Sequence, residues 1–178
     1  KKACETYAYN FPDHKLYCED IHNLKDPKKL GKVDIITSGF PCQAFSQAGL
    51  KQGFNDTRGT MFFEIQRILA HHRPKAFLLE NVKQLKGHDQ GRTLKTILAI
   101  LEGSAVPKIP EAVPISEDAR QSLETKLNYR VAYRVLKAAN FGVPQNRERV
   151  YIIGFDRDQI NAADEADICT QILDRLAK

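Results

Sequence analysis

The chain has 178 residues, of which 42% are hydrophobic and 28% are charged, and its formal net charge is +5. This length supports one domain with a substantial core. No apolar run approaches the roughly 18 residues of a membrane span, and no signal-peptide pattern is present. The sequence therefore excludes a membrane-spanning class. A modest positive charge permits nucleic-acid binding, although an ordinary basic surface explains it equally well.

The four cysteines are scattered along the chain, at Cys4, Cys18, Cys42 and Cys169. They form no C-x-x-C pair, and no histidines stand at the spacing of zinc ligands, so we expect no metal site. Reduced thiols and a cytoplasmic location are the expectation from this pattern.

Apolar periodicity and turn residues predict an alternation of helices and strands. Two amphipathic helices interleave with short apolar runs, which is typical of an α/β fold with a parallel sheet and helical crossovers. The predicted helices cover residues 1–10, 60–71, 89–102, 116–127 and 156–178, and the predicted strands cover 15–18, 33–36, 76–79, 129–136 and 150–155. Three prolines make 104–115 irregular.

Cys42 follows a predicted buried strand and a turn. Ser38 and Gly39 end the apolar run, and Pro41 fixes the backbone immediately before the thiol. In open α/β sheets the crevice at the carboxyl ends of the strands is where ligands bind. Free cysteines are more often inert small core residues than nucleophiles, so position alone does not establish a role.

Glu80 directly follows a second apolar run, residues 76–79. If the two runs are neighbouring parallel strands, Cys42 and Glu80 lie at the same edge of the sheet. A glutamate at a strand end is usually just solvated. Beside a thiol it makes a nucleophile with an acid next to it, which is the sharper hypothesis.

Three further features suggest ligand contacts. Asp20 ends a predicted strand, where nucleotide-binding α/β folds place a carboxylate for an adenosine moiety. Arg147 and Arg149 are two residues apart, so in extended backbone they project to one face and can form an anion or carbonyl clamp. A solvent-facing pair of arginines on a hairpin is the alternative. Glycine, Asn and Asp residues crowd positions 49–59, which favours an exposed loop that could close over a substrate.

Three of these stretches carry a family resemblance. The segment 39–46, Gly-Phe-Pro-Cys-Gln-Ala-Phe-Ser, looks like the catalytic loop of the DNA cytosine-5 methyltransferases of bacteria. Glu80-Asn81-Val82 resembles their second catalytic signature, and 145–151, Gln-Asn-Arg-Glu-Arg-Val-Tyr, their third. The resemblance runs from about Lys1 to Phe155, with an interruption near 103–128. It implies a Rossmann-like S-adenosylmethionine-dependent fold, with a largely parallel sheet and helices on both faces.

The resemblance also implies a role for each matching residue. Cys42 would add to C6 of a flipped cytosine, Glu80 would hold N3, Asn81 would orient Glu80, and one arginine, in preference Arg149, would hold O2. Asp20, Ile21, Pro41 and Met61 would contact S-adenosylmethionine, and Gln43, Ser46 and Arg58 would contact double-stranded DNA. Core packing alone would also explain Met61.

The chain departs from the family at both ends. It lacks the first strand, the glycine-rich cofactor loop and the target-recognition domain that the resemblance leads one to expect. We therefore expect 1–178 to be a single truncated catalytic domain with an insertion at 104–128, weakly active or inactive alone. A missing segment or a companion chain would supply the rest. A non-catalytic nucleic-acid-binding or assembly subunit, and an RNA methyltransferase, are the alternatives; the retained thiol argues against the first.

Overall fold

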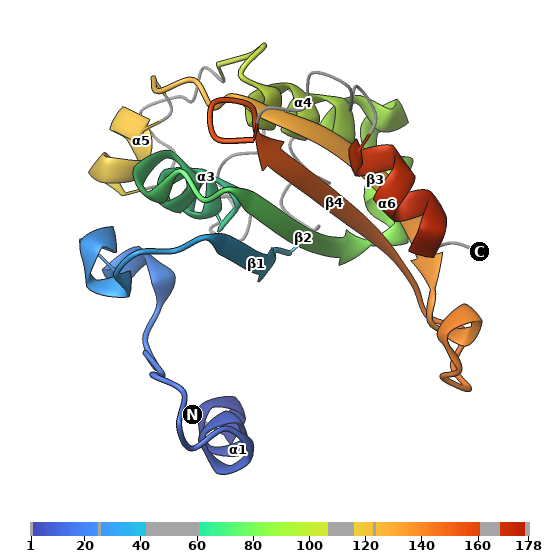
Figure 1. Ribbon diagram of the computed structural model, residues 1–178, viewed down its shortest axis with the longest axis horizontal. Coiled ribbons are helices and arrows are strands. Elements are labelled where there is room, and N and C mark those ends of the chain that lie inside the picture. Colours follow the sequence, from blue (N-terminus) through green and yellow to red (C-terminus); the bar gives the residue numbers. More distant parts are fainter. Residues whose placement is uncertain are drawn as a thin grey trace.

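A computed structural model of the chain describes residues 2–24, 26–41, 61–106, 116–122, 124–160 and 168–176. Four strands form one sheet in the order β1-β2-β4-β3 (Figure 1). They are β1 (Ile35–Gly39), β2 (Ala76–Val82), β3 (Tyr129–Lys137) and β4 (Glu148–Asp156). The predicted α/β fold is confirmed. Only β1 and β2 are parallel, because β3 returns through a hairpin into β4, so the described part of the sheet is mixed rather than largely parallel.

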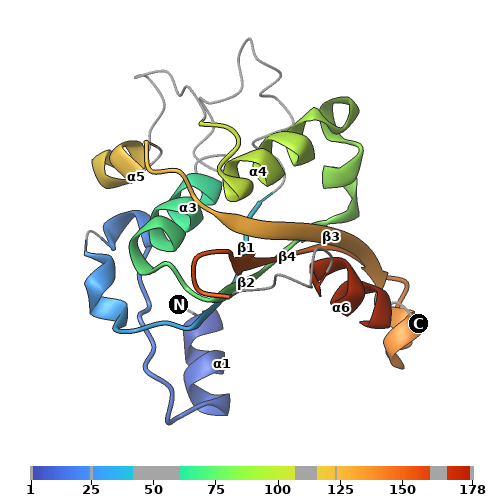
Figure 2. The same ribbon diagram turned by 45° about the horizontal axis from the view of Figure 1, so that its top comes forward.

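Helices cover both faces of this sheet, as expected. On one face α3 (Met61–His72) and α4 (Arg92–Glu102) pack on β2, β3 and β4, and on the other α6 (Ile168–Leu176) covers β3 and β4 (Figure 2). The remaining helices are α1 (Lys2–Asn10), α5 (Glu117–Ser122) and the short 3-10 turns η1 (Ile21–Asn23), η2 (Pro27–Leu30), η3 (Lys83–Lys86), η4 (His88–Gly91) and η5 (Ala138–Phe141). Among the described residues, no helix is both long and apolar enough to cross a membrane.

The main core lies between the sheet and α3 with α4. Alternate residues of β2 and β4 point into it, as the two-residue period of a strand requires. Phe77, Leu79 and Ile152 are buried there against Leu69 of α3 and Ile97 of α4. Burial of these side chains supplies most of the hydrophobic driving force that holds the strand ends in place.

Two predicted strands differ from the structure. We expected a buried strand before Cys42, but β1 is the edge of the described sheet and Ile35 is 65% exposed. Residues 15–18 were expected to form a strand, and they form none because no neighbouring strand in the described part of the chain offers them backbone partners. Periodicity indicates an extended conformation, but it does not supply a pairing partner.

The segment after the proline-rich stretch is attached to the core through a buried carboxylate. Ser116 caps α5, with its Oγ accepting from the Ala119 N–H, and the same hydroxyl donates to Oε1 of Glu64 at 2.8 Å. Glu64 is fully buried, and its Oε2 accepts from Nε of Arg67 at 2.8 Å. The predicted cap is confirmed, and α5 is thereby fixed against α3.

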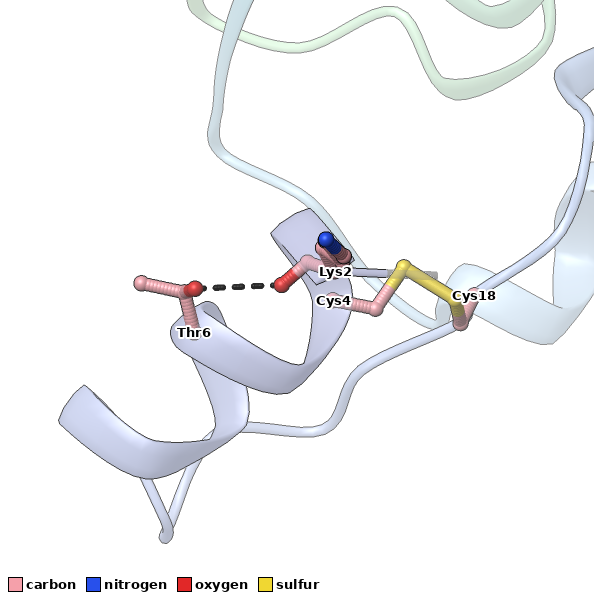
Figure 3. The surroundings of a disulfide bond; sticks show 4 residues. All are labelled: Lys2, Cys4, Thr6 and Cys18. Carbon is pink, nitrogen blue, oxygen red and sulfur yellow. Dashed lines mark hydrogen bonds between the residues drawn. A yellow bond between two sulfur atoms is a disulfide. The ribbon is translucent and has the colours of Figure 1, made fainter.

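The N-terminal helix is held by a covalent bond that the sequence did not indicate. Cys4 of α1 and Cys18 form a disulfide, with their Cα atoms 6.0 Å apart (Figure 3). The expectation of reduced thiols is therefore wrong for this pair, because the turn after α1 brings the chain back along the helix. The remaining described cysteine, Cys169, is a buried thiol. No residue of α1 is buried, and the helix lies apart from the sheet in Figure 1.

Reduction of the disulfide should loosen α1 without weakening the core. With a dithiol reductant, or in Cys4→Ser, amide hydrogen exchange of residues 2–14 should rise, because α1 buries nothing against the sheet. The midpoint of denaturant unfolding of the sheet should stay unchanged. A loss near the roughly 3 kcal/mol expected for a cross-linked loop of this length would show instead that α1 belongs to the cooperative core.

A buried carboxylate fixes the end of the sheet opposite to the predicted active site. Asp156, at the end of β4, is fully buried and accepts two hydrogen bonds from Arg73, each of 3.0 Å. Burial works to raise the pKa of Asp156, but the bonds from Arg73, Gln159 and the Asp158 backbone N–H outweigh it, so its pKa is lowered. The carboxylate therefore stabilises the fold above its ordinary pKa.

Asp156→Asn should remove this pH-dependent stability. At pH 7 the variant should lose about 2 kcal/mol of unfolding free energy, since a neutral amide cannot accept both hydrogen bonds from Arg73 as the carboxylate does. As the pH falls from about 4 to 2, the parent should lose stability more steeply than the variant, because its carboxylate is protonated only below its ordinary pKa. Urea unfolding at several pH values measures both slopes; parallel curves would contradict the assignment.

Candidate active site

The parallel pairing of β1 and β2 brings the two predicted strand ends together. Gly39 is the register partner of Glu80. The carboxylate lies over this glycine, because a Cβ built on Gly39 would stand 3.3 Å from Oε2 of Glu80. The predicted adjacency of the two strand ends is confirmed. Cys42 itself lies outside the described residues, as do Gln43, Ser46 and Arg58, so their positions stay predictions.

Arg149 holds the carboxylate of Glu80 from the neighbouring strand. Its Nε lies 2.9 Å from Oε1 of Glu80, and its Nη1 donates to the carbonyl oxygen of Glu148 at 2.8 Å. The Glu80 side chain is 38% exposed and that of Arg149 is 21% exposed, so the pair is open to a ligand on one side. One oxygen of Glu80 therefore faces the guanidinium, and the other faces the end of β1.

Asn81 has a different role from the expected one. We expected it to orient Glu80, but adjacent strand residues point to opposite faces, and its amide is buried on the core side. Nδ2 donates to the carbonyl oxygen of Phe40 at 2.8 Å, and Oδ1 accepts from the Val82 N–H at 2.8 Å. Asn81 thus fixes the backbone that leads, through Pro41, to Cys42.

Arg147 and Arg149 line the same two pockets. One, of about 190 Å³, lies against the β3–β4 hairpin and includes Phe141 and Tyr151. The other, of about 330 Å³, is bounded by Lys83 and Gln84 on one side and residues 145–149 on the other. The two arginines therefore lie close together, and Arg149 is the one that reaches Glu80. Arg149 contacts the acid, while Arg147 is exposed just before β4.

The predicted cofactor residues lie on two connected segments. Oδ1 of Asp20 accepts a hydrogen bond from the backbone N–H of His22 and also forms a hydrogen bond with Nδ1 of the His22 ring. These contacts lower the pKa of the Asp20 carboxyl. Arg67 of α3 reaches the carbonyl oxygen of Ile21 at 3.4 Å. Residues 20–21 are therefore attached to the helix that Met61 begins.

Pro41 and Met61 are linked through the aromatic residues beside them. The rings of Phe40 and Phe62 pack with their centroids 5.4 Å apart. Met61 is half-buried and Pro41 is exposed at the strand end. An exposed carboxylate at Asp20 and apolar side chains at Ile21 and Met61 fit, by their chemistry, an amine-bearing ring such as adenine.

Sequence reasoning missed several parts of the site. The carbonyl of Phe40 as the partner of Asn81, the closeness of Gly39 to Glu80, and an ion pair between Lys83 and Glu148 at 2.7 Å emerge only from the register of the strands. Lys83 directly follows the second signature and Glu148 lies within the third, which was the one available signal.

Comparisons with known proteins find close relatives of this chain. The chain is 51% identical over 161 residues to the type II methyltransferase M1.ScrFI of Lactococcus lactis subsp. cremoris, a stretch that covers 90% of this chain and 35% of that protein. It is 46% identical over 159 residues to M.HpaII of Haemophilus parainfluenzae, covering 88% and 38% of the two chains. The chain thus spans little more than a third of the length of these curated relatives.

Solved structures share the fold. The Dnmt2 methyltransferase of S. pombe superposes with a TM-score of 0.54 at 20% identity, over 86% of this chain and 38% of that one. A DNMT2 variant from Spodoptera frugiperda gives a TM-score of 0.55 at 24% identity, over 86% and 39% of the two chains. The sequence profile of the C-5 cytosine-specific DNA methylases matches residues 1–104 and 117–174. The chain belongs to the C-5 cytosine-specific DNA methylase family.

Proposed function

We propose that this chain is the catalytic region of a DNA cytosine-5 methyltransferase that acts on a flipped cytosine of double-stranded DNA. The observation that carries the proposal is the Gly39–Glu80 register, which sets an acid beside the backbone that leads to Cys42, with Arg149 on the acid's other side. Family membership and relatives named as type II methyltransferases support it. The cytoplasm, where bacterial DNA lies, is the proposed place of action.

The chemistry assigned to Cys42 is nucleophilic addition. C5 of cytosine is too weak a nucleophile to accept a methyl group directly. The Sγ thiolate would form a bond to C6, and the ring electrons would shift toward C5, with negative charge developing at N3 and O2. The bond to C6 breaks again when the C5 proton leaves, which restores the ring and the thiolate. No described residue is assigned as the base for that proton.

Glu80 and the arginines would stabilise the charge on the ring. Glu80 would bind N3 with a proton, through the oxygen that faces the end of β1, while Arg149 keeps the carboxyl oriented. A guanidinium at O2 would stabilise the developing oxyanion, and Arg147, which lines the same two pockets as Arg149, would share that role. Asn81 would keep the Phe40 backbone, and with it the approach to Cys42, in place.

S-adenosylmethionine, when bound, would supply the methyl group from its sulfonium. Asp20, Ile21, Pro41 and Met61 are the residues proposed to hold it, with Asp20 accepting from the adenine amine. Gln43, Ser46 and Arg58 are proposed DNA contacts. A target ring inside a duplex is out of reach, so the base must flip out, at a cost of a few kcal/mol that phosphate contacts partly offset.

Cys42→Ala should abolish methyl transfer. Transfer of a labelled methyl group would be measured in a reconstituted enzyme, in which this chain is joined to the flanking segments that its relatives carry. DNA with 5-fluorocytosine should form a covalent adduct with the parent but not with the variant, because fluorine cannot leave as the proton does. Cys169→Ala, which removes the buried thiol of α6 away from the predicted site, is the matched control and should keep both signals. Turnover in Cys42→Ala would rule out the nucleophile, and DNA binding by the parent without any adduct would favour a non-catalytic binding subunit.

Glu80→Gln should lower kcat by about 10² to 10³-fold, since the amide cannot deliver the proton to N3. Glu124→Gln, which changes an exposed glutamate, is the control and should transfer at the parent rate. Single-turnover assays at saturating DNA and cofactor separate this chemical step from binding. If kcat is unchanged and only the KM for DNA rises, Glu80 is a binding residue and the acid role is wrong.

A further inference from the structure

A second ion pair, Lys83–Glu148, joins β2 and β4 at the same end of the sheet as the Glu80–Arg149 pair. Lys83 directly follows β2, Glu148 begins β4, and Nζ lies 2.7 Å from Oε2. The antiparallel register pairs Val82 with Arg149, so Lys83 and Glu148 stand opposite each other one step further along. This pair therefore lies at the end of the β2–β4 ladder, where strand pairing stops.

The Glu80–Arg149 and Lys83–Glu148 ion pairs lie on opposite faces of the β2–β4 strand pair. Successive residues of a strand alternate between faces, so Glu148 and Arg149 project to opposite sides of the sheet. Arg149 meets Glu80 on one face, and Glu148 meets Lys83 on the other. Between them lies the Glu148 peptide group, whose carbonyl oxygen accepts the second hydrogen bond of Arg149 at 2.8 Å.

The Glu148 peptide is thus part of the support of Arg149. The residues before it, from 141 to 147, are exposed, and no side chain among them is buried in the core. Beyond strand pairing, the bond to Lys83 is what holds the Glu148 side chain against the end of β2. Glu148 also pairs with Lys137 of β3, so loss of the bond to Lys83 would leave β4 in the sheet. It would loosen Glu148 on the side that faces β2, where the Glu148 carbonyl oxygen accepts from Arg149.

We propose that Lys83 and Glu148 are positioning residues, whose ion pair keeps Arg149 seated on the Glu80 carboxylate. The side chains are 53% and 37% exposed, and pairs so open to water add little to global stability. The Lys83–Glu148 pair therefore acts on the local position of Arg149 rather than on the stability of the whole domain. The consequence for methyl transfer rests on the proposed function, whereas the consequence for Arg149 does not.

The sheet offers a matched control at its other end. Lys75 and Asp34, just before β2 and β1, form an ion pair of the same chemistry, with Nζ 2.9 Å from Oδ1 and side chains 55% and 57% exposed. Neither residue contacts Arg149 or Glu80 in any bond described above. Lys75→Met therefore tests whether loss of any half-exposed pair of the sheet has the same effect.

The state of Arg149 can be read directly in this chain by nitrogen-15 NMR, without DNA or cofactor. An Nε–H that is bonded to a carboxylate exchanges slowly with water. Lys83→Met and Glu148→Gln should each speed exchange of the Arg149 Nε–H by about tenfold through easier local opening, and Lys83→Arg, which keeps the ion pair, should keep the parent rate. Lys75→Met should leave it unchanged. Unaltered exchange in Lys83→Met, or equal acceleration in Lys75→Met, would overturn the proposal.

Methyl transfer in the reconstituted enzyme supplies the second readout. Lys83→Met should lower kcat by about tenfold, with the KM for DNA within about twofold of the parent, because a misplaced Arg149 harms the transition state and not DNA binding. A raised KM with unchanged kcat and a shallower salt dependence would overturn the proposal by making Lys83 a phosphate contact. If the parent enzyme transfers no methyl group at all, the proposed function fails, and the exchange rates alone decide the role of the pair.

Discussion

The site depends on the register of β1 against β2. Because the side-chain period of a strand is two, a slip by one residue would turn Glu80 to the core side and Asn81 to the open side. The register that pairs Gly39 with Glu80 avoids this, and burial of Phe77 and Leu79 on the core face enforces it. A Cβ at Gly39 would stand 3.3 Å from Oε2 of Glu80, so a larger residue there would push the carboxylate aside by a few tenths of an ångström.

Two adjacent residues of β2 serve the two halves of the proposed reaction. Glu80 faces the open side, where Arg149 of the antiparallel β4 meets it. Asn81 faces the core, where its buried amide holds the Phe40 carbonyl. The alternation of a strand thus lets one short segment present an acid to a ligand and, at the same time, fix the backbone that leads to the thiol.

Much of this arrangement could be predicted from the sequence. Apolar runs located β1, β2 and β4, the helical stripe located α3, and Ser116 and Gly103 marked the ends of helices where the structure has them. The antiparallel direction of β4 beside β2 could not be predicted, because periodicity is the same for parallel and antiparallel neighbours. The Asn81–Phe40 hydrogen bond and the Lys83–Glu148 ion pair could not be predicted either, because both depend on which strands are neighbours and in what register.

Other differences arise because tertiary contacts override local pattern. The apolar run of β1 indicates a buried strand, yet exposure is set by what lies beside it, and β1 has a described neighbour on one side alone. Cys4 and Cys18 are 14 residues apart, and no sequence motif pairs them. The turn after α1 brings the two sulfurs together. The roles of Cys42, Gln43, Ser46 and Arg58 still rest on the motif.

The buried Asn81 amide limits how far the proposed nucleophile and the acid can move relative to each other. Displacement of Phe40 would leave a buried donor and acceptor unpaired, which costs roughly 1 to 3 kcal/mol. Catalytic groups need relative positions fixed to about 0.5 Å, more tightly than loop backbone alone provides. Because Asn81 belongs to the strand that carries Glu80, a movement of that strand displaces the acid and the Phe40 backbone together. Their relative position therefore changes less than the position of either.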